Sequence, residues 1–297
     1  MLNVKNISKN YGELKAVDNI SFNIKKGEIF GLLGLNGAGK TTTFRMLIGL
    51  LEPDSGSISL NGKEINYDIT DRIGFLTEER SLLVKMTVLE QALYYGILKG
   101  MTKEKVIEKL DYLLEKFNIS EYKNKKIKEL SKGNQQKIQF ICAIINDPDL
   151  LILDEPFSGL DPINVELFKK IIIELSEKGS MIIFSSHRME HVELFCKKIL
   201  VLVKGKPVLD GYLDNIKKEY KKKNIFIKGN IEIDDIRRIK GVVDVNFEND
   251  EYIVKIEDES IVNNVFKKIS GCEITKFVVE EASLNEIFIS SVGVSYE

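Results

Sequence analysis

Residues 34–41, Gly-Leu-Asn-Gly-Ala-Gly-Lys-Thr, constrain the fold of this 297-residue chain more than any other stretch. They match the pattern G-x-x-x-x-G-K-S/T, between an apolar run at 28–33 and a helical pattern that begins at Thr41. Glycines let the backbone wrap closely around phosphate oxygens, because no Cβ blocks the positive φ angles that are required. The backbone N–H groups and the N-terminal end of the following helix then point at the anion. The order strand, glycine-rich loop, helix therefore predicts a phosphate-binding site.

The side chains of this loop suggest roles at a nucleotide. Lys40 is placed to reach the β- and γ-phosphates, and the hydroxyl of Thr41 is placed for Mg²⁺. A Gly-Lys turn that binds nothing is the alternative, and the strand before and the helix after the turn argue against it. The other candidate nucleotide-binding residues of the loop and its helix are Gly34, Leu35, Asn36, Gly37, Ala38, Gly39 and Thr42.

A second candidate element is the segment 150–155, in which four apolar residues precede Asp154 and Glu155. The apolar residues predict a buried strand, so that two carboxylates emerge together at its end. Asp154 would hold the Mg²⁺ shell, and Glu155 would polarise the attacking water. An acidic pair after an apolar strand is weak evidence alone, but together with the glycine-rich loop it indicates hydrolysis of a nucleoside triphosphate.

Composition limits the class of protein. Hydrophobic residues make up 43% and charged residues 30%, and the formal net charge of −2 gives no global attraction to nucleic acid or to an acidic membrane surface. The longest apolar runs, such as 140–145 and 199–203, fall far short of the ~20 residues that a membrane-spanning helix needs. The first twelve residues lack the apolar core of a signal peptide, so we expect the chain to remain in the cytoplasm.

The remaining pattern predicts an α/β protein followed by a smaller module. Alternation at 2–8 and 18–24 predicts antiparallel strands, 87–117 reads as helical with a capping box at Thr87 and Glu90, and 150–153 and 181–184 read as buried parallel strands. The basic segment 217–223 is interpreted as a solvated linker. After it we expect the ferredoxin-like order βαββαβ: strand 224–229, helix 232–240, strands 242–248 and 251–257, helix 259–269 and strand 272–280. A final helix should begin at Ser283, with Glu286 completing a second capping box.

Residues 130–137, Leu-Ser-Lys-Gly-Asn-Gln-Gln-Lys, resemble the LSGGQ signature of the ATP-binding cassette (ABC) family. They follow Lys40 by about ninety residues and precede the acidic strand, which is the order of that family. Residues 158–161, Ser-Gly-Leu-Asp, resemble its D-loop, and Tyr11 stands where an aromatic residue stacks on adenine. The resemblance to the nucleotide-binding subunit of ABC transporters extends over residues 1 to about 222.

The resemblance implies a P-loop NTPase cassette at 1–222, with a mixed sheet, an antiparallel β edge and a helical subdomain at about 84–145. A small α+β domain of ferredoxin-like order would occupy 223–297. Two subunits, identical or different, would face each other head to tail. Each ATP would lie between the phosphate loop of one subunit and Ser131, Gly133 and Asn134 of the other, with Asp161 in the D-loop.

The chain has only two histidines, His187 and His191, and the stretch H-R-M-E-H also fits a zinc-peptidase pattern. In the ABC family His187 resembles the switch histidine, which contacts the γ-phosphate and orients the water beside Glu155. A zinc site would need a further ligand besides the two histidines, and no third histidine exists. We therefore expect no zinc, and we expect His191 to lie at the surface or to pack on the following helix.

Two positions depart from the family pattern. In the stretch that matches the Q-loop, Gly74–Arg80, Glu78 aligns with the usual glutamine and could still ligate Mg²⁺ while adding a negative charge. Asn134 replaces the usual glutamine at the last signature position, and its shorter amide can still form a hydrogen bond. We interpret both as variants of an active site, with ATP and Mg²⁺ as the cofactors.

The resemblance extends to bacterial exporters of the sodium-extrusion and drug- or peptide-export type. It implies a separate integral membrane permease as partner, which would hold the chain at the inner face of the cell membrane. The competing class is an ABC ATPase that acts on ribosomes or nucleic acid. Such proteins carry two cassettes, coiled coils or zinc insertions that this chain lacks, so no nucleic-acid partner is expected. Two roles remain open for residues 223–297, a dimer contact or a regulatory lid, besides a purely stabilising one.

Overall fold

The computed structural model describes residues 1–79 and 81–293, apart from the side chains of residues 67 and 68. The described chain divides into two compact units, Met1–Asp210 and Gly211–Glu297, and each is described by itself. The predicted boundary after residue 222 falls at the start of β11 (Lys223–Gly229), inside the second unit. Within the described residues, no helix is both long enough and apolar enough to cross a bilayer.

The first part of unit 1 is an antiparallel sheet with the strand order β2-β1-β4-β5. Its strands are β1 (Leu2–Tyr11), β2 (Leu14–Ile24), β4 (Ser55–Leu60) and β5 (Lys63–Glu64). Leu2 pairs with Ile24 on β2 and with Leu60 on β4, and all three side chains are buried. The antiparallel strands expected from the alternating pattern are confirmed.

The second sheet of unit 1 has the order β10-β9-β3-β8-β7-β6. Its central strands, β3 (Ile29–Gly34), β8 (Met181–Ser185) and β7 (Leu150–Asp154), pair in parallel, as do β9 (Lys198–Val203) with β3 and β6 (Ile73–Leu76) with β7. β10 (Lys206–Tyr212) follows β9 after the two-residue turn 204–205. Because parallel strands end at one edge, Gly34, Asp154 and Ser185 are brought to the same edge of the sheet.

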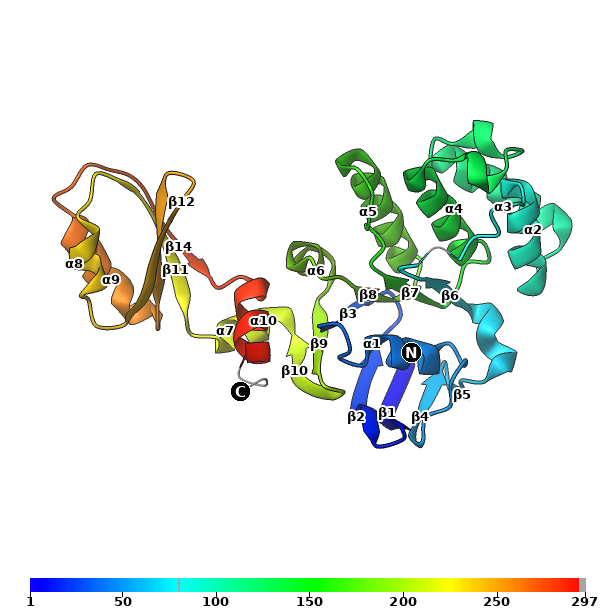
Figure 1. Cartoon of the computed structure of the whole chain (residues 1–297), viewed down its shortest axis with the longest axis horizontal. Coiled ribbons are helices and arrows are strands. Elements are labelled where there is room, and N and C mark those ends of the chain that lie inside the picture. The colour runs from blue at the N-terminus through cyan, green and yellow to red at the C-terminus, as the bar shows by residue number, and fades with distance from the viewer. Residues whose placement is uncertain (80, 294–297) are drawn as a thin grey trace. The chain divides into compact units, whose positions relative to one another are not determined.

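Helices cover this sheet and extend from it (Figure 1). The helices and turns of unit 1 are α1 (Lys40–Leu47), η1 (Tyr67–Arg72), α2 (Val88–Leu98), α3 (Lys103–Lys116), η2 (Ser120–Tyr122), η3 (Ile127–Glu129), α4 (Lys132–Ile144), α5 (Pro162–Glu177) and α6 (Met189–Phe195). The buried rings of Phe117, Phe140 and Phe168 pack together and join the end of α3 to α4 and α5.

The helical prediction over 87–117 is correct for the capping box at Thr87 but wrong about continuity, because α2 and α3 are separate helices. Gly100 adopts a φ of +77°, a left-handed conformation that suits the end of a helix. Thr102 then caps α3 by accepting a hydrogen bond from the backbone N–H of Lys105.

Unit 2 begins with α7 (Leu213–Glu219) and continues as β11, α8 (Ile233–Arg237), β12 (Val242–Glu248), β13 (Glu251–Ile256), η4 (Glu259–Ile261), α9 (Val262–Ile269), β14 (Ile274–Glu281) and α10 (Leu284–Gly293). The sheet order β12-β13-β11-β14 places β13 between β11 and β12, all pairs being antiparallel, so the predicted ferredoxin-like order is confirmed. Ile225, Val254 and Val265 form its core with α8 and α9 on one side of the sheet (Figure 1).

Two details of unit 2 differ from expectation. The segment 217–223 is not wholly a linker, since Lys217 and Lys218 lie in the last turn of α7, where their charges favour the negative end of the helix. The helix expected at 232–240 is the short α8. The second capping box is confirmed, because Ser283 and Glu286 exchange backbone-to-side-chain hydrogen bonds of 3.1 and 3.3 Å at the start of α10.

Candidate nucleotide site

The predicted phosphate loop leads from the end of β3 into α1, as the glycine pattern requires. Gly39, which precedes α1, has a φ of +104°, and a Cβ there would lie 2.4 Å from the carbonyl oxygen of Ala16 on β2. Only glycine fits so close to a backbone at this φ. Ala38 is buried, whereas Leu35, Asn36 and Gly37 are exposed at the tip of the loop, with Thr41 and Thr42 in the first turn of α1.

Lys40 points back across this loop. Its Nζ donates hydrogen bonds to the carbonyl oxygens of Gly34, at 2.6 Å, and Leu35, at 3.2 Å. Partial burial lowers the pKa of Lys40, while the negative charges of Asp154, Glu155 and Glu78 act against this shift. The predicted cation and the three predicted carboxylates therefore share one electrostatic environment at the edge of the sheet.

Asp154 ends β7 and is paired in register with Ser185 of β8. Burial raises the pKa of Asp154 to about 6, and the charge of Lys40 only partly offsets this effect. Glu78 and Glu155 raise the pKa further, because like charges disfavour ionisation. A divalent cation would relieve this repulsion, and the oxygen donors of Asp154, Glu78 and Thr41 are of the kind that Mg²⁺ prefers.

Glu155 is held by the loop that follows β8. Its carboxylate accepts hydrogen bonds from the backbone N–H of His187 at 2.6 Å and from the hydroxyl of Ser186 at 3.2 Å. The Nδ1 atom of His187 lies 3.0 Å from the same carboxylate. Glu155 itself has a φ of +50°, an uncommon conformation for a residue with a side chain, of the kind that occurs at functional sites.

The two histidines have different surroundings. His187 is exposed and contacts Glu155, whereas His191 is buried in α6 with its ring 4.8 Å from that of Phe157. Burial lowers the pKa of His191, as for a packed neutral ring. Glu190, the acid of the zinc-peptidase pattern, is largely exposed. The expected packing role of His191 is therefore confirmed, and the pair does not converge on one point.

The Q-loop residue Glu78 is exposed, and Gln139 of α4 forms hydrogen bonds to the backbone of both of its neighbours. The Nε2 atom of Gln139 lies 3.1 Å from the carbonyl oxygen of Thr77 and 3.2 Å from that of Glu79. Sequence reasoning missed Gln139 and Ser186. In the sequence, Gln139 could have been recognised as a polar residue directly before the apolar run 140–145. Arg80, the last residue of the stretch matched to the Q-loop, lies outside the described residues.

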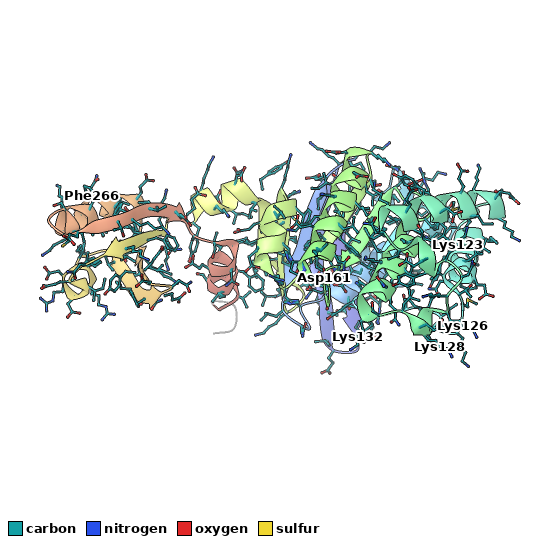
Figure 2. The ribbon with its side chains drawn as sticks, turned by 90° about the horizontal axis from the view of Figure 1, so that it is seen from above. Lys123, Lys126, Lys128, Lys132, Asp161 and Phe266 are labelled. Carbon is teal, nitrogen blue, oxygen red and sulfur yellow. The ribbon has the colours of Figure 1, made fainter. Side chains whose placement is uncertain are left out.

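The signature residues occupy the beginning of α4. Ser131 caps this helix, because its hydroxyl accepts a 3.3 Å hydrogen bond from the N–H of Asn134. Gly133 approaches Leu160 of the predicted D-loop, and Asp161 caps α5 through the N–H of Asn164 at 3.0 Å. Figure 2 labels Asp161 and Lys132, the residue next to Ser131. The contacts described for Ser131, Gly133 and Asn134 do not involve the phosphate loop of their own chain.

Tyr11 lies at the end of β1, opposite Leu14 across the tip of the β1–β2 hairpin. Tyr11 is about half exposed, and Leu14 is about two-thirds exposed. The same hairpin supplies Ala16, whose carbonyl oxygen approaches Gly39. An exposed aromatic ring thus stands on the strand pair that borders the phosphate loop.

A glycine-rich loop between a parallel strand and a helix, with carboxylates at the end of another strand of the same sheet, defines a P-loop nucleotide triphosphatase. Comparison with known proteins is more specific. The family model "ABC transporter" matches residues 17–158, and "ATP-binding protein DrrA1-3-like, C-terminal domain" matches residues 211–292. The chain belongs to the ATP-binding subunits of ABC transporters, and its activity is the hydrolysis of ATP.

Similar proteins span the whole chain. The ABC transporter ATP-binding protein YhaQ of Bacillus subtilis is 49% identical over 298 residues, which cover 100% of both chains. The bacitracin transport ATP-binding protein BcrA of Bacillus licheniformis is 30% identical over 307 residues, 99% of this chain and 97% of the relative. A solved dimeric ATP-binding cassette, bound to ADP and Pi after hydrolysis, matches 72% of this chain and 99% of its own with a TM-score of 0.66 at 26% identity.

Proposed function

We propose that Glu155 is the general base of ATP hydrolysis and that His187 orients it and senses the γ-phosphate. The observation that carries this proposal is the triple contact of the Glu155 carboxylate with His187 and Ser186, next to Lys40. A base must lie within hydrogen-bond reach of the water it activates and must be oriented by its neighbours. Thr41, Asp154 and Glu78 would hold Mg²⁺, which when bound supplies charge neutralisation at the phosphates.

The remaining nucleotide contacts follow from the same site. The backbone N–H groups of the phosphate loop, residues 34–42, surround the phosphates, and Tyr11 stacks on adenine. Ser131, Gly133 and Asn134 act on the ATP of a second ABC subunit arranged head to tail, with Asp161 at the contact. Two features support this arrangement: the signature lies away from its own phosphate loop, and the similar cassette bound to ADP and Pi is a dimer.

The second partner is a separate integral membrane permease. A groove of about 460 Å³ lies between the Q-loop segment and helices α2 and α4. We call it the α2–α4 groove. Its lining is mostly apolar and includes Ile48, Leu50, Ile73, Phe75, Leu82 and Ala143. Leu50 is 71% exposed. Leu83 and Leu98, each adjacent in the sequence to a residue that lines the groove, are also exposed. An apolar groove of this kind suits a short amphipathic helix.

Export is the proposed direction, because two similar proteins have names that include export, for lipopolysaccharide at 34% identity and for Nod factor at 36% identity. The permease would hold the chain at the inner face of the cell membrane, and cargo specificity would reside in the permease. ATP would close the dimer and hydrolysis would release it, so that the nucleotide cycle drives the permease between two states.

A pull-down of the tagged chain from detergent-solubilised membranes tests the partner. We expect a polytopic membrane protein in stoichiometric amount. It should be lost with Leu50→Glu, which places a charge in the groove, and retained with the control Leu194→Glu on α6, where the leucine is similarly exposed. Ribosomal proteins or nucleic acid without a membrane partner would refute export and leave the ATPase assignment intact.

A further inference from the structure

A buried glutamine of α4, Gln139, forms hydrogen bonds to the Q-loop segment. We propose that Gln139 is a positioning residue that holds Glu78 at the metal site. The proposal rests on the proposed role of Glu78 in holding Mg²⁺. It assigns to Gln139 no contact with nucleotide or metal.

The contacts of Gln139 converge on the residues that flank Glu78. Its Nε2 lies 3.1 Å from the carbonyl oxygen of Thr77, 3.0 Å from the Thr77 hydroxyl and 3.2 Å from the carbonyl oxygen of Glu79. The Thr77 hydroxyl in turn donates to the Glu79 carbonyl oxygen at 2.5 Å. One amide thus fixes the backbone on both sides of Glu78 while leaving the carboxylate free.

Glu78 lies at the edge of the sheet that carries the nucleotide site. β6, which ends at Leu76, pairs in parallel with β7, and Leu76 is in register with Leu153, the residue before Asp154. Thr77 and Glu78 therefore leave the sheet at the same edge as Asp154. Glu78 is exposed, and its own side chain adds little packing to hold it. A metal ligand of this kind depends on neighbouring groups for its orientation, as ligands in metal sites commonly do.

Gln139 is itself held in place by burial. The residue is 4% exposed, and Cys142 and Ala143 follow on the same face of α4. Its Oε1 atom is buried and has no hydrogen-bond partner among the described residues, so every hydrogen bond described for this amide goes to the Q-loop segment.

A simpler interpretation is that Gln139 only satisfies the carbonyl groups of an irregular loop. Ser180 does this elsewhere: its hydroxyl donates a 2.9 Å hydrogen bond to the carbonyl oxygen of Pro148. Ser180→Ala and Gln139→Met therefore each remove a side-chain hydrogen bond to a loop carbonyl, and only the second bears on Glu78.

The first test uses the full chain alone and measures the binding of a fluorescent ATP analogue as Mg²⁺ is titrated. We expect Glu78→Gln, which removes the charge of the proposed ligand, and Gln139→Met, which removes its outer partner, each to raise the Mg²⁺ concentration for half-maximal binding about tenfold. Binding without Mg²⁺ should not change, and Ser180→Ala should behave as the unmodified chain. Thr77→Val, a milder change, should shift the titration in the same direction and decides the question if Gln139→Met fails to fold.

The outcomes separate the two proposals. A shift with Glu78→Gln but none with Gln139→Met or Thr77→Val refutes the role of Gln139 and leaves that of Glu78. No shift with Glu78→Gln refutes both, and an equal shift with Ser180→Ala shows a general loosening of the fold and also refutes the inference.

Discussion

Substitution of Glu155 by glutamine should remove turnover without removing the fold. Glu155 Oε1 accepts from the His187 N–H at 2.6 Å, and a glutamine oxygen can take its place. The new amide group would face the Ser186 hydroxyl, which can rotate to accept, and Nδ1 of His187, which accepts when neutral. His187 thus keeps both contacts, and only the hydroxyl proton of Ser186 loses its acceptor, so we expect the free energy of unfolding to change by about 1 kcal/mol or less.

The chemical effect should be much larger. An amide cannot take the proton of the attacking water, so the whole contribution of a general base is lost, typically a factor of about 10²–10⁴. At about 1.4 kcal/mol for each factor of ten, the barrier to hydrolysis rises by roughly 3–5 kcal/mol. ATP binding is retained, because Lys40 and the phosphate loop are unchanged.

The assay combines ATP turnover with size-exclusion chromatography in ATP and Mg²⁺. Glu155→Gln should hydrolyse ATP at least about a hundredfold more slowly, and it should elute as a dimer that the unmodified chain forms only transiently. Glu190→Gln, an exposed position on α6, is the matched control and should leave both properties unchanged. If Glu155→Gln keeps more than about a tenth of the turnover, Glu155 is not the base.

Two further predictions concern stability. Partial burial raises the pKa of Glu286, but hydrogen bonds from Lys255, Asn224 and Ser283 outweigh it and hold the pKa below its ordinary value. This contribution is therefore present above about pH 4.5 and is lost as the pH falls through the lower folded pKa. Glu286→Gln should destabilise unit 2 by about 1 kcal/mol at pH 7 in chemical unfolding, and the difference should vanish in acid; an equal difference at both pH values would contradict this account. Phe168→Ala removes a fully buried ring between two others and should cost about 3–5 kcal/mol, whereas a cost under about 1 kcal/mol would show that the cluster is not tightly packed.

Local patterns in the sequence were sufficient for much of the fold. The phosphate loop, both capping boxes and the order of elements in unit 2 follow from spacing that involves residues close in the chain. The break between α2 and α3 was also readable from the local sequence, because Gly100 is typical of a helix end and Thr102 of a helix start. The helical spacing of apolar residues over 106–117 nevertheless favoured one continuous helix.

The missed parts of the site depend on contacts between distant segments. Gln139 meets Thr77 across 62 residues, and nothing in either stretch reveals the pairing. The left-handed backbone of Glu155 is equally hidden, because it results from the fit between the end of β7 and the loop after β8. The role of Glu155 was predicted from the acidic pair after an apolar strand, and that of His187 from the family resemblance, while their contact is a property of the tertiary fold.

The turn between β9 and β10 affects when, during synthesis of the chain, the nucleotide site becomes complete. The N–H of Gly205 donates to the carbonyl oxygen of Ala38 at 3.1 Å, and the carbonyl oxygen of Gly205 accepts from the N–H of Asp18 at 2.8 Å. One wall of the phosphate loop is therefore supplied by a residue translated long after the loop itself. At about 5–20 residues per second, the interval is on the order of ten seconds. A nascent chain therefore carries the phosphate-binding sequence for that time without this wall, and the phosphate loop reaches its full set of backbone contacts only when unit 1 is nearly finished.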